Sequence, residues 1–252
     1  MNILAPLRDK LVLSAAGANF MTGLVGNVSI PTYDGSTVGW AGEVDAAADG
    51  AGTFGEVELS PKRLTAYVDI SKQFLIQDSV SAEALLRKDI VDAISNKLEA
   101  TILGAEAGST TKPAGLFNAV VADEADITYK DIVAMEQKLE EANVNGNITF
   151  IASPYAKATL KTTAIGGTKS DVRMLMDSGE VDGYPVLVTN GMAKKGLILG
   201  NFNDLVIGQW GGIDLTVDPY TQAANGKIRL VVNAYFDAKP QRAASFVKKV
   251  LK

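Results

Sequence analysis

The chain has 252 residues, 47% of them apolar, which is enough to bury a hydrophobic core in one large domain or two smaller ones. Its 24 Lys and Arg residues and 29 Asp and Glu residues give a net charge of −5, so the whole molecule has no general attraction for nucleic acid or anionic lipid. The lack of cysteine excludes disulfides and thiolate chemistry, and the lack of histidine excludes the Ser-His-Asp triad and the usual zinc, iron and copper sites. Few enzyme classes remain.

The N-terminal segment does not read as a targeting sequence. Residues 1–17, MNILAPLRDKLVLSAAG, are too polar around Arg8, Asp9 and Lys10 for a convincing signal peptide. No apolar run approaches the roughly 18 residues that a membrane span needs. We therefore expect a soluble protein of the cytoplasm that has no membrane partner.

Residues 1–28 are rich in glycine and only weakly periodic, which favours an extended N-terminal arm. From residue 29 to residue 70 the pattern predicts a strand, a loose tip and a returning strand. The tip, residues 44–53, is almost entirely Ala, Asp and Gly, and a compact core gains little from such a hairpin.

The next segment changes to a helical period. Leu86, Ile90, Ile94, Leu98 and Ile102 recur every four residues, which predicts a helix over residues 81–103 that is buried along one stripe. At about 1.5 Å per residue this helix is about 33 Å long.

The remainder alternates short helices and strands. A helix is predicted in TYKDIVAMEQKLEEAN, with Ile132, Met135 and Leu139 facing inward, and is followed by a strand in ITFIAS and a helix in PYAKATLKTT. Strands are predicted in YPVLVTN, GLILGN, LVIGQW and AASFVKKVL, and a long hairpin pairs GIDLTVD with KIRLVVNAYFD through a turn at Asn225 and Gly226. This order predicts an α+β fold.

Possible chemical motifs are weak. The GGTKS stretch at residues 166–170 lacks the core of a phosphate-binding loop. Asp45 and Asp49 lack the spacing of a calcium loop. The remaining charged clusters are best read as solvated faces: Glu136, Glu140, Glu141, and the basic set Lys239, Arg242, Lys248, Lys249 and Lys252. No catalytic, cofactor-binding or metal-binding residue is predicted.

The order of these parts resembles the major capsid proteins of tailed double-stranded DNA bacteriophages, which have the Hong Kong 97 capsid fold. The most specific match covers residues 40–120, through GWAGEV, FGEVELSPKRLTAYVDIS, LIQDSVSAEALLRKDIVDAISNKLEATILGAEAG and KPAGLFNAV. A weaker similarity to the family is found in three later segments, SPYAKATLKT, DGYPVLVTNGM and GLILGNFNDLVIG.

The resemblance implies a division of the chain into four parts. These are an N-terminal arm (1–28) that reaches other subunits, an E-loop hairpin (29–70), a peripheral domain with a spine helix (71–127 and 212–232, helix 81–103), and an axial domain (128–211 and 233–252). The E-loop would lie across a neighbouring subunit through Tyr33, Trp40, Glu43, Asp45, Asp49, Phe54, Glu56, Glu58, Lys62 and Arg63. The peripheral loop at the three-fold junctions would use Asp218, Tyr220, Gln222, Asn225 and Lys227.

The resemblance also implies a non-enzymatic role. The protein would self-assemble into hexamers and pentamers of an icosahedral shell around phage double-stranded DNA, with scaffold, portal and possible decoration proteins as partners and the DNA only in proximity. Assembly would occur in the bacterial cytoplasm and the product would be the virion capsid.

Two features differ from many family members. A scaffolding segment before the arm is not evident, so we expect scaffolding to be a separate protein or the chain to be a processed product. The tip also lacks the lysine that some members use to cross-link subunits, and Lys62 lies only near the loop base. An encapsulin-type nanocompartment shell protein and, more remotely, a His-free carboxylate hydrolase are the alternatives.

Overall fold

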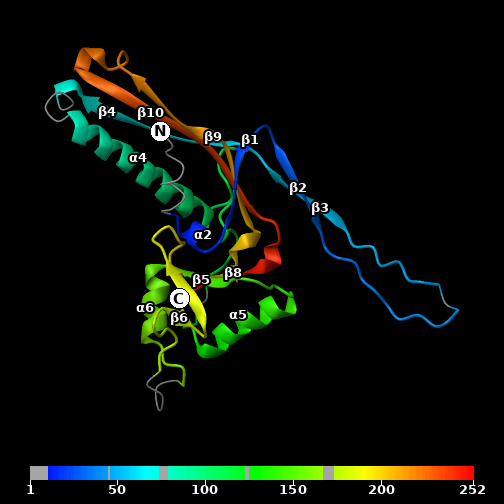
Figure 1. The fold of residues 1–252 in the computed structure, drawn as a ribbon. Helices are drawn as coiled ribbons and strands as arrows, with labels where there is room; N and C mark the ends of the chain where they lie inside the picture. The colour runs from blue at the N-terminus through cyan, green and yellow to red at the C-terminus, as the bar shows by residue number, and fades with distance from the viewer. Residues whose placement is uncertain (1–10, 45, 74–78, 123–124, 167–172) are drawn as a thin grey trace.

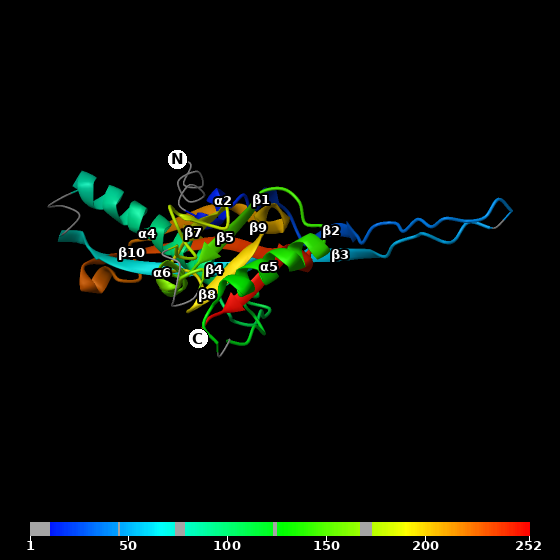
Figure 2. The same cartoon turned by 90° about the horizontal axis from the view of Figure 1, so that it is seen from below.

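The computed structural model describes residues 11–44, 46–73, 79–122, 125–166 and 173–252. The body contains a four-stranded sheet covered by a long helix and a five-stranded sheet accompanied by two shorter helices. A two-stranded hairpin extends far from the body in both views (Figures 1 and 2). The architecture is α+β, as predicted.

The four-stranded sheet joins segments that are far apart in the sequence. In spatial order it contains β1 (Asn19–Leu24), β9 (Leu205–Asp218), β10 (Lys227–Pro240) and β4 (Lys62–Ser71). β10 pairs antiparallel with both β9 and β4, whereas β1 runs parallel to β9. The N-terminal and C-terminal thirds of the chain therefore build one sheet.

The long helix α4 (Ser79–Ile102) lies along β4 and β10 (Figure 1). Ile90, Ile94, Leu98 and Ile102 are buried in one cluster with apolar residues of β10, including Phe236. The predicted helix and its apolar stripe are thus confirmed for these residues. The helix differs only at its ends, since it begins two residues earlier and ends one residue earlier than expected.

The five-stranded sheet belongs to the second part of the body. Its spatial order is β11 (Phe246–Val250), β8 (Gly196–Asn201), β5 (Ile148–Ala152), β7 (Tyr184–Val188) and β6 (Glu180–Val181). The helices α5 (Tyr129–Glu141) and α6 (Pro154–Thr162) contribute to a second buried cluster with this sheet. Ile132, Met135 and Leu139 of α5 are all buried, as predicted.

Asp131 fixes the start of α5. Its carboxylate accepts the backbone N–H and the hydroxyl of Thr128 at 2.8 and 2.6 Å, and Lys249 of β11 lies 2.9 Å away. Partial burial raises the pKa of Asp131, but the hydrogen bonds from Thr128 and Lys249 outweigh it and lower the pKa to about 2. This carboxylate therefore links the helix start to the last strand.

We expect Asp131→Ala to lower the free energy of unfolding of the isolated subunit by about 1 kcal/mol near pH 6, because the helix loses its capping box. A folded pKa below the ordinary value of about 3.9 means that the contribution is present above that pH and is lost as the pH falls towards 2. Urea unfolding at pH 6, 4 and 2.5 measures this dependence. A difference between wild type and variant that did not shrink with acidification would contradict it.

The N-terminal segment differs from the expected arm. Residues 1–10 lie outside the described residues, but Leu11, Leu13 and Ala16 are buried in the main core around α2 (Val12–Ala15). The Val12 N–H donates to Glu99 of α4 at 3.2 Å, and burial raises the pKa of that carboxyl. With β1 paired to β9, residues 11–24 are part of this subunit's own core, and the prediction of an arm was wrong for them.

The hairpin is shorter than the predicted E-loop of residues 29–70. β2 (Val28–Tyr33) pairs with β3 (Phe54–Leu59), but the next strand, β4, pairs with β10 in the body. Residues 62–70 therefore belong to the sheet beneath α4 and not to the hairpin. The chain changes from one sheet to the other at Ser60 and Pro61, where it has no strand structure.

The C-terminal hairpin is longer than predicted. The first strand, β9, joins the two predicted strands LVIGQW and GIDLTVD into one and continues through Gly211, which has a φ of +64. The second strand, β10, extends beyond the predicted KIRLVVNAYFD as far as Pro240. The turn has the short 3-10 helix η2 (Ala223–Asn225), followed by Gly226 at φ +63, so the turn expected at these residues is confirmed. Two further single-turn 3-10 helices are η1 (Phe202–Asp204) and η3 (Ala243–Ser245).

Candidate intersubunit surfaces

The hairpin is regular at its root and loose towards its tip. The β2–β3 register runs from Val28 opposite Leu59 to Tyr33 opposite Phe54, whose ring centroids are 4.6 Å apart. Beyond this pair the two arms of the hairpin are joined by scattered hydrogen bonds, such as Thr37 N–H to the Gly50 carbonyl at 2.9 Å and the Thr53 hydroxyl to Asp34 at 3.0 Å. The predicted loose tip agrees with the structure of the described residues.

Several of the predicted E-loop side chains have partners within the subunit, mostly in the hairpin itself. Glu56 accepts a hydrogen bond from Ser29 at 2.7 Å, and Asp49 accepts the Ala51 N–H at 3.0 Å. The hydrogen bonds of Tyr33 with Ser36 and the Gly52 N–H lower the pKa of its phenol and tie the loop to itself. The members of the set that are exposed are Tyr33, Trp40, Glu43, Asp49, Phe54, Glu56, Glu58 and Arg63, while Asp45 lies outside the described residues.

Trp40 and Phe54 distinguish the hairpin from an ordinary surface loop. The Trp40 side chain is fully exposed and that of Phe54 is 83% exposed. Val38 and Val44 are also exposed at nearly their full area. Several large apolar side chains that are exposed on one hairpin are typical of a contact surface for another molecule. The geometry therefore supports intersubunit contact by this hairpin.

Lys62 and Arg63 do not lie on the hairpin, contrary to the prediction. Both are on β4, and Lys62 Nζ lies 2.6 Å from Asp237 of β10, with side-chain exposures of 10% and 1%. Asp237 also accepts the Ser60 N–H at 3.0 Å. Lys62 is therefore engaged inside its own subunit, because it balances a buried carboxylate at the root of the hairpin.

A second contact holds the other side of the hairpin root. Trp210 of β9 donates its indole N–H to the Gly26 carbonyl at 2.6 Å. Trp210 is buried with Leu59 and Val206, and Val28 and Ile30 pack against this small cluster. The hairpin thus leaves the body from a packed base, which limits its direction.

We expect Lys62→Met to lower the free energy of unfolding by about 3 to 5 kcal/mol, because the buried Asp237 carboxylate loses its counter-charge. Lys112→Met is the matched control, since the Lys112–Glu106 pair is exposed, at 45% and 69%, and exposed pairs contribute little to stability. Chemical denaturation of both variants compares the two sites. An equal loss of stability in the two variants would show that the buried Asp237 carboxylate does not need the charge of Lys62.

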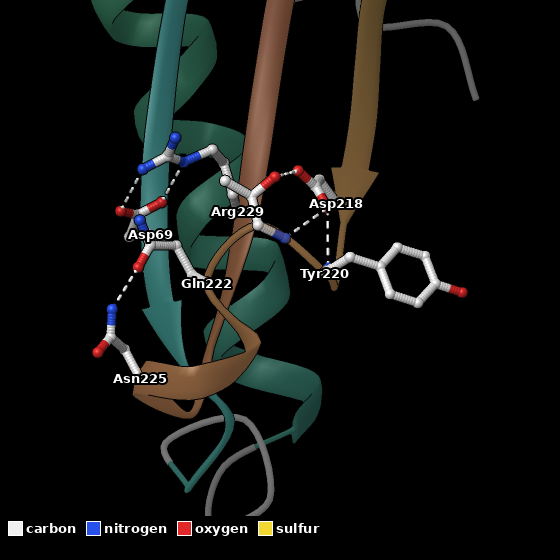
Figure 3. Close-up of polar contacts among 7 residues, drawn as sticks. Asp69, Asp218, Tyr220, Gln222, Asn225 and Arg229 are labelled. Carbon is white, nitrogen blue, oxygen red and sulfur yellow. Dashed lines mark hydrogen bonds and ion pairs between the residues drawn. The ribbon is translucent and has the colours of Figure 1, made fainter.

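The predicted three-fold loop is organised by its own hydrogen bonds (Figure 3). Asp218 accepts the backbone N–H groups of Tyr220 and Thr221 at 2.8 and 3.1 Å, and Asn225 donates to Gln222 at 2.7 Å. The hydrogen bond from the Thr221 hydroxyl, together with those from the two backbone N–H groups, lowers the pKa of Asp218. Tyr220 is 84% exposed and points away from the strands (Figure 3). Lys227 is exposed at the start of β10.

An ion pair that the sequence analysis missed supports this loop. Arg229 of β10 donates to both carboxylate oxygens of Asp69 on β4, at 2.7 and 2.9 Å, and its guanidinium lies 4.2 Å from the Tyr67 ring centroid. The hydrogen bonds from Arg229 lower the pKa of Asp69. The opposed positions of Arg229 and Asp69 depend on the β4–β10 register, which local sequence patterns do not reveal.

Conventional chemical sites are not evident in the part of the chain that the structure describes. The searched residues contain no group of three or more Asp and Glu side chains placed to bind a metal ion. None of the described helices is long and apolar enough to cross a membrane. The GGTKS stretch lies mostly outside the described residues.

The fold is shared with solved structures at low sequence identity. One is described as "Capsid of native GTA particle computed with C5 symmetry", with a TM-score of 0.75, 17% identity and coverage of 93% of this chain and 87% of that chain. Another, from Gordonia phage Cozz, has a TM-score of 0.71, 14% identity and coverage of 96% and 86%. The body and hairpin therefore define the phage-capsid class of fold, in agreement with the predicted Hong Kong 97-type fold.

The sequence comparisons give the family. The model of the phage capsid family matches residues 1–251, and the chain belongs to this family. A major capsid protein of Halomonas phage phiHAP-1 is 28% identical over 95% of this chain, and one of Klebsiella oxytoca phage phiKO2 is 25% identical over 82%. The matches cover 40% and 53% of these relatives, so the chain spans about half their length or less.

Proposed function

We propose that this protein is the structural subunit of an icosahedral capsid that encloses phage double-stranded DNA. The single observation that carries the proposal is the hairpin that extends from the body (Figure 2), together with the exposed Trp40 beyond its paired strands. A subunit that functioned alone would gain nothing from this surface, whereas membership of the phage capsid family supplies a partner for it. That partner is another copy of the chain.

The proposed mechanism is geometric. The hairpin and the loop around Tyr220 extend contacts to neighbouring subunits within and between hexamers and pentamers. Each contact is modest, but a closed symmetric shell repeats it at every subunit, so the contacts sum to a stable particle. No covalent chemistry and no cofactor is required of the chain, and we propose that it is not an enzyme.

We assign the two sheets of the body to the peripheral and axial domains that the resemblance to the capsid family implies, with domain boundaries that follow the observed sheets. The sheet of β1, β9, β10 and β4 with α4 would form the peripheral part, and the sheet around β5 and β8 with α5 and α6 would form the axial part near capsomer centres. Scaffold, portal and possible decoration proteins would be the further partners. Assembly in the bacterial cytoplasm would place the product in the virion capsid, with DNA only in proximity.

The test is electron microscopy of the purified full chain, combined with sedimentation. We expect closed shells or isolated hexamers and pentamers. A species that sediments as a monomer near 26.5 kDa under all conditions, together with hydrolytic activity lost on one carboxylate substitution, would overturn the proposal in favour of the hydrolase. Shells that contain protein cargo and never DNA when isolated from infected cells would favour the encapsulin-type alternative.

A further inference from the structure

A cavity of about 190 Å³ lies where the two sheets of the body meet. The end of α4, the segment that follows it, the start of β9, the end of β10 and the strand β11 all contribute to its wall. Most of the wall is apolar and includes Ile102, Leu205 and Ala238. The polar side chains that line it are those of Asn118, Lys239 and Lys248. Among the described residues, the lining therefore contains two cations and no acid.

Lys248 lies on the core-facing side of β11. Alternate residues of a strand point to opposite faces, and the residues on either side of it on this face, Phe246 and Val250, both pack in or against the main core. The next residue, Lys249, points the other way and lies 2.9 Å from Asp131. The sequence analysis placed both lysines on a solvated face, and the structure differs from this for Lys248, which is partly buried.

The two cations of the cavity have no counter-charge within the described residues. No carboxylate lies within ion-pair distance of Lys248 or of Lys239, which is exposed at the end of β10. Burial lowers the pKa of the Lys248 ammonium, as expected for a charge that loses water and gains no partner. A partly desolvated and unpaired ammonium is unfavourable. An anion that entered the cavity would relieve this cost.

The geometry points to a ligand site. We propose that the cavity binds a small organic acid, whose carboxylate contacts Lys248 and Lys239 and whose apolar body fills the space beside the apolar wall. The size limits the ligand, because a cavity of about 150 Å³ holds a benzene ring, whereas pockets for drug-sized ligands have about 300 Å³ or more. The ligand is therefore a carboxylic acid of about the size of benzoate. The inference goes beyond the proposed capsid role and does not depend on it.

The lining favours an organic acid over a phosphate group of packaged DNA. A phosphodiester is polar and is joined to a sugar on both sides, so it gains nothing from an apolar wall such as that around Ile102 and Leu205. A carboxylate on a hydrocarbon body matches both parts of the lining, since the charge faces the lysines and the body is removed from water.

The test is equilibrium dialysis of the full chain with labelled benzoate. We expect one benzoate per subunit, with half-saturation at or below about 1 mM, which lies within the affinity that a ligand of this size can reach. Benzamide has the ring without the charge, and inorganic phosphate has the charge without the ring. Neither should displace benzoate as well as unlabelled benzoate does.

Two lysine variants locate the site. Lys248→Met should weaken benzoate binding about tenfold or more, because the carboxylate loses a charge-assisted contact. Lys249→Met is the matched control, since it removes the same charge from the opposite face of the same strand and should leave benzoate binding unchanged. Circular dichroism checks that both variants are folded. Without benzoate, Lys248→Met should resist urea at least as well as wild type, because it removes an unpaired and partly buried charge.

Each contrary result overturns the inference. The absence of saturable benzoate binding would do so, as would equal binding by wild type and Lys248→Met. Displacement by phosphate as effective as that by unlabelled benzoate would assign a site for bare anions, such as the phosphates of DNA, in place of an organic acid. A clear loss of stability in Lys248→Met without benzoate would assign the lysine to the fold. None of these results bears on the capsid role, which electron microscopy tests separately.

Discussion

Removing the distal part of the hairpin should leave a folded subunit that cannot form shells. The change deletes residues 37–50 and joins Ser36 to Ala51 through Asn-Gly, which suits a two-residue hairpin turn. The deleted segment includes Val38, Trp40 and Val44, all exposed, so the core loses almost nothing. The proposed intersubunit surface would lose its largest apolar side chain, and the loss would be repeated at every subunit of a closed particle.

Thermal melting of the dissociated subunit and particle yield by electron microscopy measure the two effects. We expect a small change in melting temperature and a collapse of shell yield. The control is Val121→Ala, in the segment between α4 and α5, which removes an exposed apolar side chain outside both proposed contact surfaces and should leave yield close to wild type. Unfolding of the deletion variant would show that the tip belongs to the core, and normal shells would show that the tip is dispensable.

Ile94→Asp should abolish folding of the subunit. Ile94 is buried in the centre of α4, within the cluster that joins this helix to the four-stranded sheet. An unpaired carboxylate there costs several kcal/mol. The lost packing of Ile94 adds a further few kcal/mol, against a total stability of roughly 5 to 15 kcal/mol for a typical domain. Insoluble expression or loss of cooperative unfolding is the expected result.

Asn96→Asp is the matched control for this prediction. Asn96 lies two residues further along the same helix and is exposed, so the same carboxylate should be tolerated there. Solubility and circular dichroism of the two variants make the comparison. Soluble, assembling Ile94→Asp protein would show that the buried stripe of α4 is not what joins the helix to the sheet.

The elements that local patterns specify were predicted well. The four-residue spacing from Ile90 to Ile102 carries the helical period of α4, and Ile132, Met135 and Leu139 do the same for α5. The Ala, Asp and Gly composition of residues 44–53 indicated a loose tip because such residues provide little to pack. In each of these cases the information lies within a few consecutive turns or residues.

The errors concern pairing over long sequence distances. Residues 11–24 look like an arm because glycines interrupt their pattern, but β1 pairs with β9, which lies near the other end of the chain. The strand from Lys62 to Ser71 follows the hairpin in sequence, yet its partner is β10. No local periodicity distinguishes a strand that pairs with its neighbour from one that pairs with a distant segment.

The same limit applies to the side chains of the candidate surfaces. Lys62 was placed on the hairpin because it is near it in sequence, whereas its contact with Asp237 depends on the β4–β10 register. The Arg229–Asp69 pair escaped notice for the same reason. Exposure of Trp40 and Phe54 agrees with the predicted contact surface, but their contacts with a neighbouring subunit stay a prediction.

The most direct test of the central claim is a cryo-electron microscopy reconstruction of assembled particles at a resolution that traces the hairpin. We expect density for residues 28–59 to leave its own subunit and lie on an adjacent copy, with the Trp40 side chain, which is fully exposed in the single subunit, covered by that copy. A hairpin folded onto its own body, or one that projects into solvent without touching a neighbour, would contradict the account.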